Sequence, residues 1–181
     1  YDGTAVNVTG ASSNESDNMD PTTHYTVTYY KNTGTIESPD WTPVADANNV
    51  KDAGQYKAVI TGAGDYEGAK ESVFTISKNT TPPTISVGTG VDGIVLDPSG
   101  TQAIGATALG STEGFSYSVS PATGVVSVSA DGTITADANG SGTATITITL
   151  AEDDNHVGNT KDITVYVKQS GIGGNMPDCF T

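Results

Sequence analysis

Arginine is missing from all 181 residues, and seven lysines oppose 21 acidic side chains, which gives a net charge of −14. Arginine supplies the planar fork that reads phosphates and guanine edges, and a strongly negative protein repels polyanions. The same field disfavours anionic lipid surfaces. The composition therefore predicts that nucleic acids are not partners of this chain.

Cysteine is nearly absent too, because Cys179 is the single one, so no internal disulfide can form. No run of about 18 apolar residues occurs, so we expect no membrane insertion. The start, Tyr1-Asp2-Gly3, has no initiator methionine and no charged-then-apolar signal region, and we expect an excised piece or a mature fragment. Acidic chains poor in cysteine and arginine are typical of Gram-positive surface proteins. We therefore expect an extracellular protein, wall-attached or secreted.

Threonine and glycine are abundant instead, with 28 and 22 residues. This composition favours many short β-strands joined by tight turns, and no stretch resembles a useful amphipathic helix. Alternation of apolar and polar residues predicts the strands. The expected strands are Ala5–Thr9, Tyr25–Tyr30, Trp41–Val44, Gln55–Thr61, Glu71–Ser77, Thr84–Val87, Thr101–Ala108, Phe115–Ser120, Val125–Ser129, Thr133–Ala136, Thr143–Leu150 and Asp162–Lys168.

A proline pair, Pro82-Pro83, interrupts this pattern and favours a stiff, extended connector. We therefore predict a first domain over residues 1–78, a linker over 79–83 and a second domain over 84–168. A glycine-rich tail follows over 169–181, and we expect Ile172, Met176 or Phe180 to anchor it.

The residues that open one expected strand carry the fold signal. Asp52-Ala53-Gly54-Gln55-Tyr56 has the Asp-x-Gly-x-Tyr pattern of the tyrosine corner of immunoglobulin-like sandwiches, in which the tyrosine hydroxyl bonds backbone just upstream. Tyr56, Ala58 and Ile60 should share the core face, with Ala58 where antibody domains have cysteine. We expect an all-β chain of two immunoglobulin-like β-sandwiches in tandem.

The two halves end alike. Tyr56, Ala58 and Ile60 precede Ile146, Ile148 and Leu150 by 90 positions, which predicts the same closing hairpin in both halves. In the last strands, Phe74 and Ile76 should face inward in the first half, and Ile163, Val165 and Val167 in the second. This pattern indicates an old duplication of one sandwich type.

Several motifs resemble known bacterial modules. The first half resembles the YDG/MBG-type repeat domains of large bacterial surface proteins, through Tyr1–Ala5, Tyr25–Tyr30, Asp52–Tyr56 and Gly64–Gly68. The second half resembles bacterial immunoglobulin-like group 2 domains, through Val125–Ala136 with its Asp-Gly turn and through Gly142–Ile148. The resemblance implies secreted or wall-attached spacer and adhesion modules in tandem arrays, without catalytic residues.

No residue pattern predicts catalysis, a cofactor or a metal site. His24 and His156 lie in or beside expected loops with no Ser-centred or Cys-His motif, and Cys179 lacks a nearby base. Two acidic clusters offer oxygen ligands for Ca²⁺ but match no calcium loop, and we interpret them as solvated turns. These clusters are Glu15, Asp17, Asn18 and Asp20, and Glu152, Asp153, Asp154 and Asn155.

Aromatic and lysine side chains raise two further possibilities. Trp41 could stack on sugar rings together with Tyr29, Tyr30 or Tyr66, although a lone tryptophan beside proline is more often a core or sheet-edge residue. An intramolecular Lys–Asn isopeptide bond requires a lysine on an apolar face. Lys57 should point outward, and Lys78 and Lys168 end their strands, so we do not expect this bond.

The sequence thus predicts a non-enzymatic structural or adhesion segment, a spacer or stalk, of a larger bacterial surface or secreted protein. Its partners would be neighbouring immunoglobulin-like modules of the same chain, and a host or glycan ligand stays open. The alternative is an accessory carbohydrate-binding or spacer module of a secreted glycan-active enzyme, which requires an exposed aromatic strip that includes Trp41.

Overall fold

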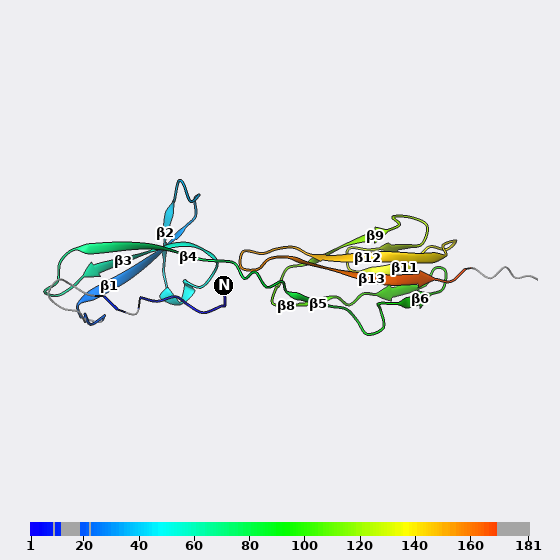
Figure 1. Cartoon of the computed structure of the whole chain (residues 1–181), viewed down its shortest axis with the longest axis horizontal. Helices are drawn as coiled ribbons and strands as arrows, with labels where there is room; N and C mark the ends of the chain where they lie inside the picture. The colour runs from blue at the N-terminus through cyan, green and yellow to red at the C-terminus, as the bar shows by residue number, and fades with distance from the viewer. Residues whose placement is uncertain (9, 12–18, 22, 170–181) are drawn as a thin grey trace, which may run out of the picture. The chain divides into compact units, whose positions relative to one another are not determined.

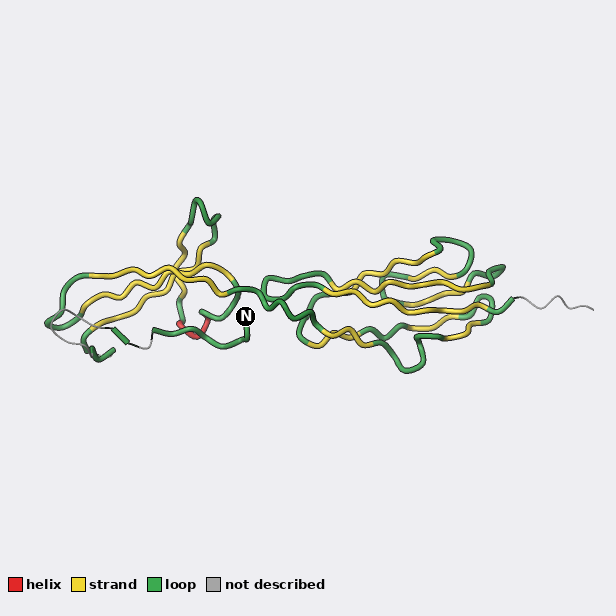
Figure 2. Tube along the Cα trace, viewed as in Figure 1, coloured by secondary structure: helices red, strands yellow, loops and turns green. Residues whose placement is uncertain are grey.

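The structure is a computed structural model that describes residues 1–8, 10, 11, 19–21 and 23–169. The described chain is all-β: its secondary structure is thirteen strands and one short 3₁₀ turn (Figures 1 and 2). Contacts divide it into two compact units. The first is Tyr1–Thr80 with Asp154–His156, and the second is Thr81–Asp153 with the chain from Val157 onward.

The first unit is built on one antiparallel sheet in the order β2–β1–β3–β4 (Figure 1). The segments that form it are rich in threonine, valine and tyrosine, which suit a pleated, half-buried surface. The sheet comprises β1 (Tyr25–Asn32), β2 (Trp41–Val44), β3 (Gly54–Gly62) and β4 (Ala69–Ile76). The predicted closing hairpin is the β3–β4 pair.

An irregular layer covers the inner face of this sheet. The Val6 N–H donates to the Val50 carbonyl at 2.8 Å, and the Val8 N–H donates to the Tyr29 hydroxyl at 2.7 Å. The turn η1 (Ala47–Asn49) precedes Val50, which is fully buried. Because their amides bond to a loop and a side chain instead of a ladder, Ala5–Val8 do not form the expected strand; Thr9 lies outside the described residues.

The tyrosine corner is confirmed. Tyr56 is 1 % exposed, and its hydroxyl donates to the Asp52 carbonyl at 3.1 Å. Burial, and secondarily the charge of Asp52, raise the pKa of the Tyr56 phenol. Ala58 is buried beside it, whereas Ile60 on the same face is only half-buried. Alternation thus predicted the inward face of this strand correctly. Ile60 is more exposed than Ala58 because fewer side chains cover the sheet near Ile60.

The second unit is a sandwich of two layers. One layer is β6–β13–β12–β9, in which β6 and β13 pair in parallel; the other contains β10–β11–β7 and β5–β8. Its strands are β5 (Thr84–Ser86), β6 (Ile94–Leu96), β7 (Thr101–Ala103), β8 (Thr107–Leu109), β9 (Phe115–Ser120), β10 (Val126–Val128), β11 (Thr133–Ala136), β12 (Gly142–Leu150) and β13 (Asn159–Val167).

The strand order is immunoglobulin-like. When β8 and β7 are taken as two halves of one strand, β5, β8/β7, β11 and β10 follow the A-B-E-D order, and β9, β12 and β13 follow C-F-G. In the first unit, β2–β1–β3–β4 corresponds to the C′-C-F-G sheet alone.

The core of the second unit lies between its layers. Alternate residues of β12 and β13 are almost fully buried and contact apolar side chains of the opposite layer, as the alternation predicted for Ile163, Val165 and Val167. Phe74 and Ile76 likewise pack against the core of the first unit, as expected.

Two strand predictions in the second unit differ from the structure. The segment 101–108 forms two strands instead of one, because the chain bends at Gly105, whose φ of +60° lies in the left-handed region that glycine tolerates. In addition, β6 was not predicted from the sequence.

Candidate functional site

The outer face of the first sheet carries the predicted Trp41 cluster. The Lys57 ammonium lies 5.2 Å from the centroid of the Trp41 ring and 5.4 Å from that of Tyr30. It also pairs with the Glu71 carboxylate at 3.2 Å. Register explains the grouping, because Lys57 is directly opposite Tyr30 on β1, and Glu71 is on the neighbouring strand β4. The cluster joins all four strands through cation–π and ionic contacts.

Only one of the three predicted partners accompanies Trp41. Tyr29 points to the inner face, is 5 % exposed and accepts the hydrogen bond from Val8. Tyr66 lies in the β3–β4 turn, where its ring is 4.9 Å from the ring of His24. Tyr30 is therefore the aromatic neighbour that Trp41 has among the predicted partners. Lys57 lies over both rings, so a sugar would have to displace it to use those faces.

The two histidines make structural contacts. His24 accepts a hydrogen bond at Nδ1 from the Asp20 amide at 2.9 Å, and the His156 ring meets the Tyr1 ring edge-on at 5.2 Å. Within the described residues, no group of three or more histidine, cysteine or acidic side chains is placed to hold a metal ion. Glu15, Asp17, Asn18, Cys179 and the predicted tail anchors Ile172, Met176 and Phe180 lie outside the described residues.

The lysines considered for an isopeptide bond lie on or near the surface. Lys57 points outward, as predicted, and Lys168 pairs with Asp97 at 3.0 Å with both side chains largely exposed. Lys78 follows β4 and is half-buried. Exposed ion pairs of this kind contribute little to stability.

The Asp-Gly hairpin between β10 and β11 is a structural element. The Asp131 carboxylate accepts from the Ser129 hydroxyl and from the Thr133 amide, the latter at 3.1 Å. These hydrogen bonds hold the pKa of the Asp131 carboxyl below its usual value. Gly132 has a φ of +80°, and a Cβ there would lie 2.7 Å from the Tyr117 hydroxyl. Both residues are thus explained by turn geometry.

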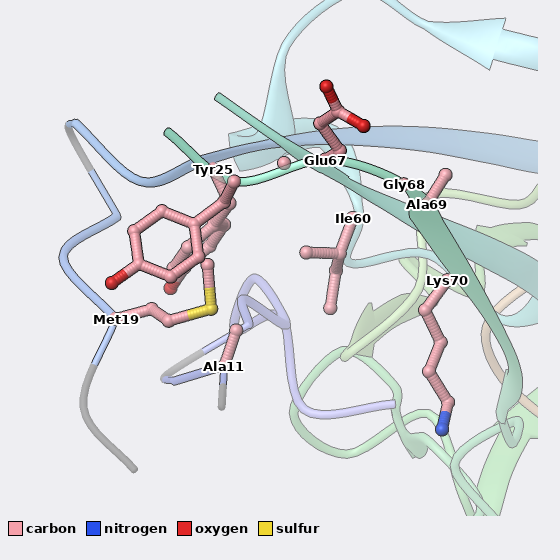
Figure 3. A pocket seen from close by; sticks show the side chains of 10 residues that line it. Ala11, Met19, Tyr25, Ile60, Glu67, Gly68, Ala69 and Lys70 are labelled. Atoms are coloured by element: carbon pink, nitrogen blue, oxygen red, sulfur yellow. The ribbon is translucent and has the colours of Figure 1, made fainter. Parts of the chain in front are cut away.

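One cavity in the first unit was not predicted from the sequence. It has a volume of about 460 Å³ and lies on the inner side of the sheet, where β3 and β4 turn (Figure 3). Apolar side chains of Ala11, Met19 and Ile60 line it together with Tyr25. Tyr25 is 1 % exposed, and its hydroxyl has no hydrogen-bond partner among the described residues. The sequence predicted a strand over Tyr25–Tyr30, but no pattern in it predicts the burial of Tyr25 or the missing partner of its hydroxyl.

Within the described residues, no helix is long and apolar enough to cross a membrane.

No family model matches the sequence, and no curated protein matches it. Among solved structures, the tandem Ig repeats of Dlar match with 16 % identity and a TM-score of 0.31, over 81 % of this chain and 84 % of that one. Murine CEACAM1b matches with 13 % identity and a TM-score of 0.30, over 78 % of this chain and 84 % of that one. Superpositions this loose carry no functional argument, and the immunoglobulin-like assignment rests on the strand order.

Proposed function

We propose that the chain is a non-enzymatic structural segment, a spacer or stalk, of a larger bacterial cell-surface or secreted protein. The observation that carries this proposal is the arrangement of the terminal strands in the second unit. The chain enters this unit next to β5 and leaves it at the end of β13, at opposite ends of the sandwich (Figure 1).

Hydrogen bonds between β6, near the start of this unit, and β13, at its end, lie across the strands and therefore across the direction of pull. β6 pairs with β13 in parallel, and flanking bonds join Gly93 to Thr164 at 2.8 Å and Lys168 to Leu96 at 2.9 Å. Tension applied to the two ends pulls these segments past each other, so the bonds share the load instead of opening one at a time. Such geometry suits a segment that holds other parts of a protein at a distance.

Sequence motifs support the bacterial and surface parts of the proposal. The first unit has the YDG/MBG-like residues Tyr1-Asp2-Gly3, and the second has the group 2-like Asp131-Gly132 hairpin. The net charge of −14 favours a soluble, well-hydrated surface. Under this proposal, neighbouring immunoglobulin-like modules of the same chain are its partners.

Localisation and mechanics test the proposal separately. Antibodies raised against the chain should label intact producing cells or the culture medium; labelling that requires cell lysis would refute the surface assignment.

For mechanics, a variant with Cys179→Ser can be pulled between cysteines at Thr84 and Lys168. The matched control is pulled between cysteines at Ser141 and Lys168, which flank the paired ends of β12 and β13. End-to-end rupture should need the higher force. Equal or lower force would contradict the tension-bearing role.

The carbohydrate-binding alternative has one observation in its favour, the half-buried Trp41 beside Tyr30 on the outer face. Lys57 over both rings counts against it. Binding on a glycan array that Trp41→Ala abolishes, and Tyr66→Ala leaves unchanged, would favour this alternative over the spacer.

A further inference from the structure

The last strand of the first unit has an unpaired edge. In the second unit, the last strand β13 pairs with β12 on one side and with β6 on the other. In the first unit, the equivalent strand β4 pairs with β3 and ends the sheet. Among the described residues, no segment occupies the position that β6 takes in the second unit.

Register identifies the backbone groups at this edge. The Gly62 amide donates to the Gly68 carbonyl at 2.9 Å, which makes these opposite residues a hydrogen-bonded pair. Hydrogen-bonded and non-bonded pairs alternate along an antiparallel ladder. Even-numbered residues of β4 therefore bond to β3, and the odd-numbered ones direct their N–H and C=O groups to the open edge: Ala69, Glu71, Val73 and Thr75. All four residues are exposed.

The cavity beside Tyr25 borders the first half of this edge. Five consecutive residues, Tyr66–Lys70, line it, so main chain as well as side chains forms this wall. A Cβ built on Gly68 meets no atom within 4 Å, which shows open space at the start of β4. Figure 3 shows Ile60 between Met19 on one side and Lys70 on the other. Tyr25, whose hydroxyl has no hydrogen-bond partner among the described residues, also lines the cavity.

We propose that the β4 edge and this cavity form one strand-addition site, which binds an extended peptide segment of another protein. The segment lies beside β4, as β6 lies beside β13, and bonds to the backbone of Ala69, Glu71, Val73 and Thr75. One of its side chains fills the cavity. In such sites, main-chain bonds give affinity, and pockets for alternate side chains give specificity. This inference goes beyond the spacer role and does not depend on it.

Charge and cavity chemistry define the partner. Two copies of this chain would each bring a net charge of −14, which opposes self-pairing, so a neutral or basic segment fits better. The cavity wall combines apolar side chains, such as Met19 and Ile60, with the charged Glu67 and Lys70. Among the described residues, the hydroxyl of Tyr25, which also lines the cavity, has no hydrogen-bond partner. The anchor side chain should therefore have an apolar body and a hydrogen-bonding end.

Among the described residues, the open edge along the second half of β4 ends at Ser77, whose carbonyl accepts a hydrogen bond from the Tyr1 ammonium. Natural sheets protect their edges with proline, bulges or inward-pointing charges. β4 has neither proline nor a bulge in its register with β3, and its inward lysine, Lys70, lies in the first half. Val73, at the centre of the edge, is 53 % exposed.

Binding of the full chain to a peptide array tests the site. The array contains capped ten-residue peptides that alternate threonine with valine, carry a lysine at each end and vary the anchor residue. Fluorescence anisotropy should show saturable binding, strongest for anchors with a polar end. Val73→Pro removes an edge N–H without touching a β3–β4 bond and should weaken binding at least about fivefold, the ratio that one net hydrogen bond is worth. The matched control Val73→Thr keeps the N–H and should bind normally.

Two further readouts separate strand addition from simple occupation of the cavity. With saturating peptide, hydrogen exchange should slow at the Ala69, Glu71, Val73 and Thr75 amides, while the bonded amides of β4 stay protected throughout. Tyr25→Phe should lower the affinity for peptides with a polar anchor more than the affinity for peptides with a phenylalanine anchor. No binding to any peptide at millimolar concentration, equal binding by Val73→Pro, or unchanged exchange at the four edge amides would each overturn the proposal.

Discussion

Replacing Tyr56 tests the element that fixes the first unit. The side chain is 1 % exposed, its ring stacks on Phe74 with centroids 5.7 Å apart, and its hydroxyl donates to the Asp52 carbonyl at 3.1 Å. Tyr56→Phe keeps the ring and its packing and removes one neutral hydrogen bond. We expect the free energy of unfolding to fall by about 1 kcal/mol. For a unit of this size, that corresponds to a drop of about 4–8 °C in Tm.

Tyr56→Ala removes the ring as well. A large aromatic side chain that leaves a cavity costs about 3–5 kcal/mol, a large share of the roughly 5–15 kcal/mol that stabilises a small domain. The structure therefore predicts a clear ranking: wild type, then the phenylalanine variant, then the alanine variant. Part of the lost stability in the alanine variant should come from Phe74, because its ring no longer has a stacking partner.

The pH dependence provides an independent check on the hydroxyl. Burial raises the pKa of Tyr56 above its usual value of about 10.0. The folded protein thus binds this proton more tightly than the unfolded chain, so the contribution to stability is complete below pH 10 and is lost as pH rises through the folded pKa. Tyr56→Phe should remove this part of the alkaline loss.

Urea melts of the wild type and both variants, followed by circular dichroism at neutral pH and between pH 9 and 11, supply the measurements. Equal and negligible effects of both substitutions would refute the tyrosine-corner assignment. A phenylalanine variant as stable as the wild type at every pH would show that the hydroxyl contributes nothing.

Three further predictions follow from other elements. Fragments 1–78 and 84–168 should each fold alone; a single cooperative melt that neither fragment reproduces would contradict this prediction. Asp131 has a lowered pKa, so its contribution is present at neutral pH and is lost as pH falls below about 4; Asp131→Asn should flatten the acid limb of the stability curve, measured by thermal melts from pH 2 to 7. Gly132→Ala should cost at least about 1 kcal/mol in urea melts, because its φ of +80° disfavours a side chain and its Cβ would meet Tyr117; an unchanged midpoint would refute that steric reasoning.

Local alternation predicted much of the fold. Trp41–Val44, Phe115–Ser120 and Thr133–Ala136 have the bounds expected from the sequence, since each alternates and ends at a turn signal. By contrast, β6 has three consecutive apolar residues between glycine- and proline-containing turns. Its strand character comes from pairing with β13, far along the chain, and a local pattern cannot show that pairing.

In the candidate sites too, local alternation predicted some features, whereas others depend on residues far apart in the chain. The outward direction of Lys57 followed from alternation, but its position over Trp41 and Tyr30 depends on the register of three strands. The cavity beside Tyr25 depends on how residues before β1 return to the sheet, as Ala11 and Met19 do, and no periodicity describes that path. An open edge is visible only once the strand order is known.

The last strand of the second unit, β13, lies inside its sheet, and this position determines when the unit can fold during synthesis. β13 contributes nine residue pairs with β12 and three with β6, so the second unit lacks a large part of its hydrogen bonds until residue 167 has left the ribosome or a secretion pore. The pairs with β12 close a local hairpin, whereas those with β6 join residues far apart in the chain, such as Ile94 and Val165, and such contacts form slowly. Until β13 is available, the apolar side of β12 stays open to solvent and to chaperones. Under the proposed surface role, the unit would therefore cross the membrane before β13 has paired, and it would gain the hydrogen bonds of β13 on the far side.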